Sequence, residues 1–456
     1  MPKSLQQMID EAKSPAHMLQ NAPTGAFEFP VQSMWSNLID EGEAWRKSAI
    51  LFDQSFHMTE LRIKGPDTLR LLSDFSINNF ANFGKDKAKQ IVCCNKDGYL
   101  ISDAIIFGYG EDDVLVVGRP VVPNWLQFNA ETGGYDVEVS IDHLRAYDPT
   151  NPRPHYRFEI QGPLAMDILN DVNQGPELTT RFFAMGEITI AGCKAHTLVH
   201  AMGGVKGLEI WGPFADKARV EAALVEAGKK HGMRRGGSRS YSITAGESGW
   251  FAAPLPAVYD GEDMRPYREW LTEYHFEGFS SVGGSYQPED VRDYYITPFD
   301  LEYDRLIHWD HEFLGREALL AMKDQPHRKK VILVWDKEGV VSVFASLLEE
   351  GEMAMWMDIP SSDYAIHPYD RVESNGKLVG ISGYPLYSVN ERAWLSVSMV
   401  DAEFAEPGTR LEIVWGEANG GTAKPSVHRH RQVKIGAEAQ SWPIHEAARR
   451  EYRAQA

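Results

Sequence analysis

Three side chains that could take part in binding or catalysis lie in or beside strand-like runs. His57 opens HMTELRI (57–63), Arg119 follows VLVVG (114–118), and Glu209 lies in GLEIWG (207–212). A histidine donates hydrogen bonds and titrates near neutral pH, an arginine forks onto a carboxylate, and a glutamate accepts from amino groups. Each also has an ordinary explanation, as a satisfied core histidine, a surface arginine or a glutamate facing water, and the residues alone leave both open.

The familiar motifs of nucleotide, metal and serine chemistry are missing. No Walker A loop occurs, Gly108-Tyr-Gly110 lacks the third glycine of a dinucleotide fingerprint, and GISG (380–383) is one residue short of a nucleophile elbow. The histidine pairs in HWDH (308–311) and HRH (428–430) lack a further spaced ligand, and such pairs are usually surface features. We therefore expect proton donors acting with a bound organic cofactor, and no metal.

Composition narrows the class of protein. A chain of 456 residues predicts two or three domains, and a formal net charge of −19 disfavours nucleic acid as a partner. Three cysteines without a C-x-x-C pair favour a reducing compartment. The polar N-terminus, MPKSLQQMIDEAK, lacks the apolar core of a signal peptide, and no apolar run is long enough to span a bilayer. We expect a cytoplasmic protein without a membrane partner; the oligomeric state stays open.

The elements that must position these residues can be read from periodicity. We expect strands at 57–63, 99–108 and 114–118, and helices at 66–75, 124–132, 214–228 and 313–323. IKGPDTLRLLSDF (63–75) recurs in register as IQGPLAMDILNDV (160–172), which predicts two strand–turn–helix units in which Gly ends the strand and Pro opens the helix. Pseudo-duplicated lobes of an α+β fold follow from this repeat.

The texture of the chain changes after residue 325. Short strand-like runs separated by turns (VILVW, KLVGIS, AWLSVSMV and RLEIVWG) predict a C-terminal barrel or jelly roll at 326–456, following an α+β region of two interleaved lobes at 1–325. No long helix is expected there before a surface helix at 444–453, and 351–370 looks like an irregular surface insertion.

Six segments in collinear order resemble the glycine-cleavage T-protein superfamily of tetrahydrofolate-dependent aminomethyl- and methyltransferases. Each segment alone is weak, but the six together span nearly the whole chain. They are IKGPDTLRLLSDF (63–75), DGYLISDAIIF (97–107), FEIQGPLAMDIL (158–169), GLEIWG (207–212), TPFDLEYDRLIHWDHEFLGREALL (297–320) and the C-terminal stretch that begins LVGISGYPLYSV.

Within that superfamily the chain is most similar to the aryl-methyl-ether O-demethylases of the vanillate, 3-O-methylgallate and syringate type. The segments that carry this likeness are FDQSFHM (52–58), VVGRP (116–120), ETGGYDV (131–137) and GSRSYSITAGESGWFAAPLPAVY (237–259). True T-proteins have a Leu-Arg-Leu-Glu stretch near the last of these, where this chain has Tyr241 and Ile243-Thr-Ala-Gly246. That departure argues against an aminomethyltransferase.

The resemblance implies transfer of a methyl group from a methoxylated aromatic acid to N5 of tetrahydrofolate, in the catabolism of lignin-derived aromatics. His57 and Tyr241 match the family's hydrogen-bond donors to the ether oxygen. Arg119 becomes the candidate for the substrate carboxylate. The remaining candidates are Gln54, Met58, Phe27, Phe29, Phe182 and Trp250 around the substrate, and Glu209, Trp211, Asp103 and Trp250 around folate.

Several alternatives stay open at this stage. Asp103 matches the position of the T-protein's functional aspartate, but it either acts in catalysis or only orients folate. Phe27 and Phe29 replace tyrosines of related O-demethylases, which favours a less polar ring, although core packing explains them equally well. The rival functions are a folate-dependent transferase acting on an N-methyl or S-methyl compound and a non-catalytic folate-binding protein.

Overall fold

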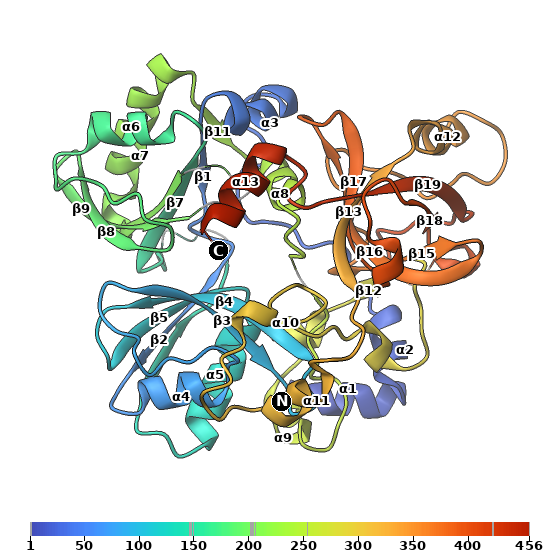
Figure 1. The fold of residues 1–456 in the computed structure, drawn as a ribbon, viewed down its shortest axis with the longest axis horizontal. Helices are drawn as coiled ribbons and strands as arrows, with labels where there is room; N and C mark the ends of the chain where they lie inside the picture. The colour runs from blue at the N-terminus through green and yellow to red at the C-terminus, as the bar shows by residue number, and fades with distance from the viewer. Residues whose placement is uncertain are drawn as a thin grey trace.

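Two sheet-containing lobes and a closed barrel make up the computed structural model, which describes residues 2–145, 148, 150–200, 205, 207–252, 254–421 and 424–455 (Figure 1). The first lobe holds a six-stranded sheet. In spatial order its strands are β11 (Arg234–Gly236), β1 (Ile50–Asp53), β7 (His155–Gln161), β10 (Gly207–Pro213), β9 (Cys193–Val199) and β8 (Met185–Ile190).

The second lobe is a five-stranded sheet. Its order is β3 (Ala88–Cys94), β4 (Leu100–Gly108), β5 (Asp113–Gly118), β2 (Thr59–Lys64) and β6 (Glu138–Asp142). Because β1 and β2 belong to different sheets, residues 54–58 form the crossing between the lobes. Phe107 and Leu115 of the second sheet pack with Leu198 and Trp211 of the first in one buried cluster that joins the lobes.

The repeated Gly-Pro segments build equivalent units in the two lobes. The first runs from β2 into α4 (Thr68–Asp74), and the second runs from β7 into α6 (Ala165–Val172). Their glycines, Gly65 and Gly162, have φ of 142° and 130°, which only glycine adopts readily. The predicted duplication is therefore present in the backbone conformation as well as in the sequence.

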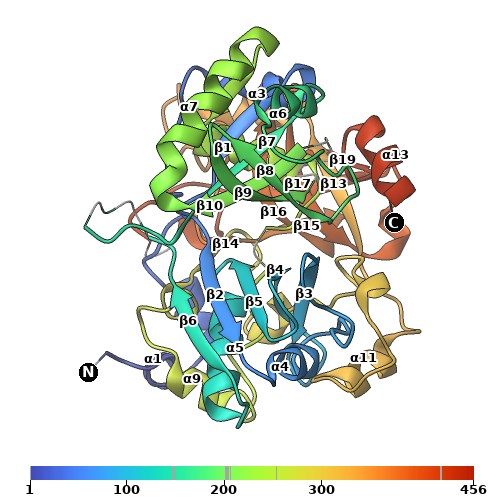
Figure 2. The same cartoon turned by 90° about the vertical axis from the view of Figure 1, so that its left-hand side faces the viewer.

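Helices cover the outer sides of both sheets (Figure 2). Alongside α6, the first lobe carries α7 (Lys217–Gly228), whose Val220 and Leu224 pack in a cluster with Phe158 and Ile160 of β7. The remaining helices of the 1–325 region are α1 (Leu5–Ala12), α2 (Pro15–Gln20), α3 (Leu38–Lys47), α5 (Val121–Thr132), α8 (Ser238–Glu247), α9 (Arg265–Trp270), α10 (Phe276–Phe279) and α11 (Arg316–Met322).

The C-terminal region forms the predicted barrel. Its closed strand order is β13 (Lys329–Trp335), β17 (Ala393–Val400), β16 (Lys377–Ser388), β15 (Asp370–Ser374), β18 (Arg410–Trp415) and β19 (Val433–Gln440), and α13 (Glu446–Gln455) follows it. One large core cluster contains lobe residues such as Phe251 and Tyr259 together with Ile381 and Val397 of the barrel. The division at residues 325/326 falls between α11 and β13 and stays a prediction.

Two expectations for this region are wrong. KEGVVSVFAS forms a helix, α12 (Lys337–Ser346), because Val340 and Val343 pack into the barrel core. The stretch at 351–370 is also no surface insertion: Tyr364 and Ile366 are buried, and β14 (His367–Pro368) pairs in parallel with β12 (Val282–Gly283). Tyr364 packs in the barrel core and Ile366 in the core shared with the lobes, which the irregular sequence pattern did not reveal.

Candidate active site

A cavity of about 710 Å³ is lined by residues of both lobes and of the barrel. Of the residues named from the sequence, only Trp211 is absent from its lining. The others lie together in the cavity wall: Phe27, Phe29, Gln54, His57, Met58, Asp103, Arg119, Phe182, Glu209, Tyr241 and Trp250. Residues that are far apart in the sequence thus meet in one site, although the role of each stays a prediction.

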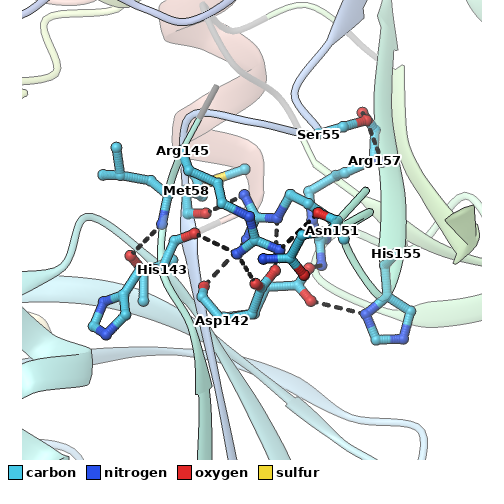
Figure 3. A network of polar contacts seen from close by, with 12 residues as sticks. Ser55, Met58, Asp142, His143, Arg145, Asn151, His155 and Arg157 are labelled. Carbon is cyan, nitrogen blue, oxygen red and sulfur yellow. Dashed lines mark hydrogen bonds and ion pairs between the residues drawn. The ribbon is translucent and has the colours of Figure 1, made fainter. Parts of the chain in front are cut away.

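The crossing at residues 54–58 carries Gln54, His57 and Met58 into the cavity and is held by backbone hydrogen bonds. The Gln54 amide donates to the Arg157 carbonyl at 2.8 Å, and the Arg157 amide donates to Ser55 Oγ at 3.0 Å. At the other end, Arg153 Nη1 donates to the Met58 carbonyl at 2.7 Å while its Nε donates to Asp142 Oδ2. Figure 3 shows this network, with Met58 and Asp142 near its centre. It fixes the backbone on both sides of His57.

His57 and Tyr241 are in direct contact, although they are 184 positions apart in the sequence. Tyr241 lies on α8, and its hydroxyl is 3.2 Å from His57 Nε2. Gln54 Nε2 also donates to the Tyr241 hydroxyl, at 3.4 Å. With the imidazole proton on Nε2, both neighbours donate to the tyrosine oxygen, and the tyrosine's own proton can be donated into the cavity.

His57 is neutral near physiological pH. This residue is only 8 % exposed, and burial lowers its pKa to about 3, with the guanidinium groups of Arg119, Arg153 and Arg157 acting in the same direction. The expectation that this imidazole titrates near the working pH is therefore wrong. Burial also raises the pKa of Tyr241, so the phenol keeps its proton. The pair consists of two neutral hydrogen-bond donors.

Glu159 and His200 also line the cavity, and the sequence reasoning missed both. Glu159 on β7 is 1 % exposed and accepts hydrogen bonds from the side-chain amides of Gln54 and Gln161. His200 Nδ1 lies 3.4 Å from Glu159 Oε1, and although burial opposes the charge, that carboxylate raises the pKa of His200. A glutamate within a run of buried strand residues was the one available signal.

Aromatic rings surround the donor pair. The Phe29 ring centroid lies 5.3 Å from that of His57 and 5.5 Å from that of Tyr241, both in edge-to-face geometry. Phe27 packs on Phe29 at 5.2 Å, and the Arg119 guanidinium lies 5.7 Å from the centroid of the Phe27 ring. An arginine, an apolar wall and two donors are thus arranged around one space that fits an aromatic acid.

Glu209 extends from β10 into the cavity and belongs to a buried network of ion pairs. Its Oε1 pairs with Arg157 Nη1, and Arg157 Nη2 donates to Glu60 Oε1 at 3.2 Å. Glu60 Oε2 in turn lies 2.8 Å from Nδ1 of His155, at the edge of the network in Figure 3. The buried Arg157 therefore holds Glu209 as an oriented carboxylate that can accept hydrogen bonds from a ligand.

Trp211 requires a correction. It shares a strand face with Glu209, as expected, but it is fully buried and its ring packs 4.6 Å from Phe107 in the cluster between the lobes. Its Nε1 donates to the Tyr109 hydroxyl at 2.8 Å, and Arg157 lies 5.1 Å from its ring centroid. Trp211 therefore packs against Arg157 on the side away from the cavity and does not line the cavity.

The end of the cavity near Asp103 is polar. Gln90 Nε2 donates to Asp103 Oδ2 at 2.6 Å, and the Tyr303 hydroxyl reaches the same oxygen at 3.4 Å. Burial raises the pKa of Asp103 and lowers that of the nearby Lys330, from the barrel strand β13, to about 8. Lys89 and Arg305 also line the cavity. A carboxyl group and three basic side chains therefore contribute to the lining of the cavity.

Two kinds of feature are absent from the described residues. They contain no group of three or more histidine, cysteine, aspartate or glutamate side chains placed to hold a metal ion. Within the same residues, no helix is long and apolar enough to cross a membrane.

Comparison with protein families and curated proteins gives a consistent result. The GCVT N-terminal domain family matches residues 14–253. The syringate O-demethylase of Sphingobium sp. (strain NBRC 103272 / SYK-6) is 41% identical over 453 residues, covering 99% of this chain and 98% of that protein. The sesamin methylene transferase of Sinomonas sp. (strain No.22) is 25% identical over 374 residues, covering 78% of each chain.

A solved structure supports the fold. The crystal structure of the glycine cleavage system aminomethyltransferase T from Bartonella henselae superposes with a TM-score of 0.58 and covers 93% of this chain and 95% of that one. At 14% sequence identity this likeness establishes the arrangement of lobes and barrel alone.

Proposed function

The chain belongs to the GCVT family, and on that premise we propose that it is a tetrahydrofolate-dependent O-demethylase of methoxylated aromatic acids such as syringate or vanillate. The products are a phenol and 5-methyltetrahydrofolate. The observation that carries the proposal is the contact of His57 and Tyr241, 3.2 Å apart, in a cavity that also holds Arg119.

The chemistry of the cavity fits both reactants. Arg119 and the phenylalanine wall suit an aromatic carboxylate, because guanidinium forks onto carboxylate oxygens and the wall covers the ring. Glu209 and Asp103 suit the amino and N–H groups of a pterin. Lys89, Arg305 and Lys330 suit the carboxylates of a folate's glutamate. When bound, tetrahydrofolate supplies the nitrogen that accepts the methyl group.

The protein's part in the reaction is to stabilise the departing oxygen. The methyl carbon–oxygen bond of an aryl ether is inert because phenoxide leaves poorly, so a hydrogen bond that strengthens as negative charge develops on oxygen lowers the barrier. With the His57 proton on Nε2, Tyr241 is placed to donate that hydrogen bond, since Gln54 and His57 then both donate to its own oxygen. The aromatic wall keeps water from the reacting atoms and orients the ring.

The test is anaerobic incubation of the protein with tetrahydrofolate and either syringate or vanillate, with mass-spectrometric detection of 5-methyltetrahydrofolate. Folate-dependent loss of the ring methyl group is the expected result. The ratio of the two rates then narrows the substrate. If folate binds but neither acid is demethylated, the proposal is wrong and N-methyl or S-methyl donors become the substrates to examine.

A further inference from the structure

Asp363 is a cavity residue that neither the sequence motifs nor the proposed chemistry uses. It lies in the stretch before β14, where Ser361, Ala365 and Ile366 also line the cavity. The parallel pairing of β14 with β12 and the hydrogen bond from the Ile366 amide to Ser281 Oγ at 3.1 Å hold this stretch against the lobes. The barrel side of the molecule thus contributes a carboxyl group to the substrate cavity.

The carboxyl of Asp363 has an unmet hydrogen-bonding demand. Its Oδ1 is shielded from water and has no hydrogen-bond partner among the residues that the structure describes, so a ligand in the cavity is reached by the other oxygen, Oδ2. An ionised carboxylate in such a position is costly, whereas a protonated one is cheaper and can itself donate. Consistent with this, burial raises the pKa of Asp363 to about 7, against the attraction of Arg119.

Arg119 lies close enough to act on Asp363 electrostatically, yet the two do not pair. No nitrogen–oxygen distance within 4.0 Å joins them in the described part of the chain, although both line the same cavity. A direct ion pair would occupy both groups and leave nothing for a ligand. The observed separation leaves Arg119 available for an anion and leaves Asp363 beside it.

We propose that Asp363 donates a hydrogen bond to the carboxylate of the aromatic acid held by Arg119, so that acid recognition requires a protonated Asp363. This inference rests on the proposed function and extends it to the choice of substrate. An arginine alone attracts any anion. A neighbouring carboxyl that must be protonated adds a second requirement, because its ionised form repels the substrate carboxylate.

Three groups near Asp363 bear on its titration. Arg119 favours the ionised form, and Asp370 on β15 disfavours it. Asp370 accepts hydrogen bonds from the Tyr364 hydroxyl at 2.6 Å and from the Ser285 amide at 3.0 Å, and burial raises its pKa to about 7 as well. Tyr364 stays neutral because burial raises its pKa. Asp370 is therefore the rival carboxyl beside Asp363 and supplies the control variant. Lys330 and His200 also line the cavity and titrate in this range, and neither is changed by Asp363→Asn.

The experiment compares an aromatic acid with its primary carboxamide. Syringate and syringamide are each assayed from pH 6 to 9 with saturating tetrahydrofolate, following loss of the ring methyl group. The ratio of their kcat/KM values cancels the pH effects that act equally on both compounds, such as those on folate, so it reports how the protonation state of the site discriminates a carboxylate from a carboxamide. We expect this ratio to fall by up to about tenfold for each pH unit above 7 in the unsubstituted protein.

Asp363→Asn and Asp370→Asn decide which carboxyl is responsible. An asparagine side chain donates a hydrogen bond at every pH, so Asp363→Asn is expected to abolish the decline, while Asp370→Asn keeps it. A ratio that declines equally in Asp363→Asn, or one that is flat with pH in the unsubstituted protein, overturns the inference. Absence of demethylation of both compounds by the unsubstituted protein at any pH would instead overturn the proposed function.

Discussion

At the level of single residues, the site depends on two neutral donors and one fixed cation. Burial keeps His57 unprotonated and Tyr241 protonated, so neither gains nor loses a proton over the physiological range. The leaving oxygen is then stabilised by a hydrogen bond from the Tyr241 hydroxyl. His57 and Gln54 contact that hydroxyl and orient it. For stabilising the leaving oxygen, the identity of each donor therefore matters more than the pH of the medium.

Tyr241→Phe removes the donor while it keeps the ring against Phe29 and Phe52. We expect kcat to fall by about 10²–10⁴-fold, the range for losing one positioned donor or acid. Tetrahydrofolate affinity, measured by calorimetry, should stay within about threefold, since a phenylalanine keeps the edge-to-face packing of the wall. Turnover close to that of the unsubstituted protein would show that another group stabilises the oxygen.

His57→Ala is expected to lower kcat as well, because it removes the neighbour that orients the Tyr241 hydroxyl. A companion His57→Gln variant, whose amide can still donate to that hydroxyl, should retain more activity than His57→Ala. Steady-state rates of methyl transfer for the two variants test this ordering. The reverse ordering would contradict an orienting role for His57.

Arg119→Ala should raise KM for an aromatic acid by about tenfold to a hundredfold, as expected for loss of a charge-assisted hydrogen bond. Its KM for the corresponding carboxamide should change much less. Arg153, which is buried and binds Asp142 and the Met58 carbonyl, offers a contrast. Arg153→Lys should affect acid and amide alike, because it loosens the loop that carries His57 without touching the carboxylate.

At the level of elements, the two Gly-Pro turns set how the strand and the following helix pack in each lobe. A Cβ at Gly162 would lie 2.5 Å from the Ser48 carbonyl oxygen, and its φ of 130° is strained for any other residue. Ser48 directly precedes the segment that leads into β1, so this turn sets where the first sheet meets α6.

Gly162→Ala should lower the free energy of unfolding by about 1–3 kcal/mol, since backbone atoms on both sides must move. Gly192→Ala is the matched control. It also has a positive φ, 76°, but its added Cβ would meet nothing within 4 Å. Denaturant titrations of both variants test the difference, and equal losses would show that backbone strain alone, without the Ser48 contact, sets the cost.

At the level of the whole molecule, the barrel completes the cavity and is tied to the lobes through α8. Glu247, at the end of α8, pairs with Arg46 Nη2 of α3 at 2.7 Å and accepts a hydrogen bond from Ser388 Oγ of the barrel strand β16. The same helix carries Tyr241. A substitution at Glu247 therefore affects both the packing of the barrel against the lobes and the position of the Tyr241 hydroxyl.

Burial raises the pKa of Glu247 to about 7, against the attraction of Arg46. Because the folded value lies above the unfolded one, this group's stabilising contribution is complete below pH about 4.5 and is lost as pH rises to about 7. Glu247→Gln does not titrate. Relative to the unsubstituted protein, its free energy of unfolding should therefore increase by roughly 1–3 kcal/mol between pH 4.5 and 7.5. Denaturant titrations at several pH values measure this difference, and a difference that is constant with pH would contradict it.

The sequence by itself determined the architecture and several of its elements, although not α8, which carries Tyr241, or α12. Strands β2, β4 and β5 lie within two residues of their predicted bounds, and the four predicted runs form β13, β16, β17 and β18 of the barrel. The barrel also needs β15 and β19, which no predicted run covers. Period-two alternation, glycine at the turns and proline at helix starts are local properties, so they can be read without the fold. The family resemblance predicted His57, Tyr241 and Arg119 as site residues, and all three line the cavity.

Only the tertiary structure decided which side chains face one another. Trp211 shares a face with Glu209 but lies beyond Arg157, because the second sheet covers that part of the strand. Asp363 and His200 entered the site from segments with no motif, and Glu159 came from the FEIQGPLAMDIL segment without being singled out. Residues of 351–370 became part of the cavity wall because this stretch is buried between the barrel and the lobes. The neutral state of His57 likewise depends on burial by distant residues, a non-local quantity that sequence spacing does not contain.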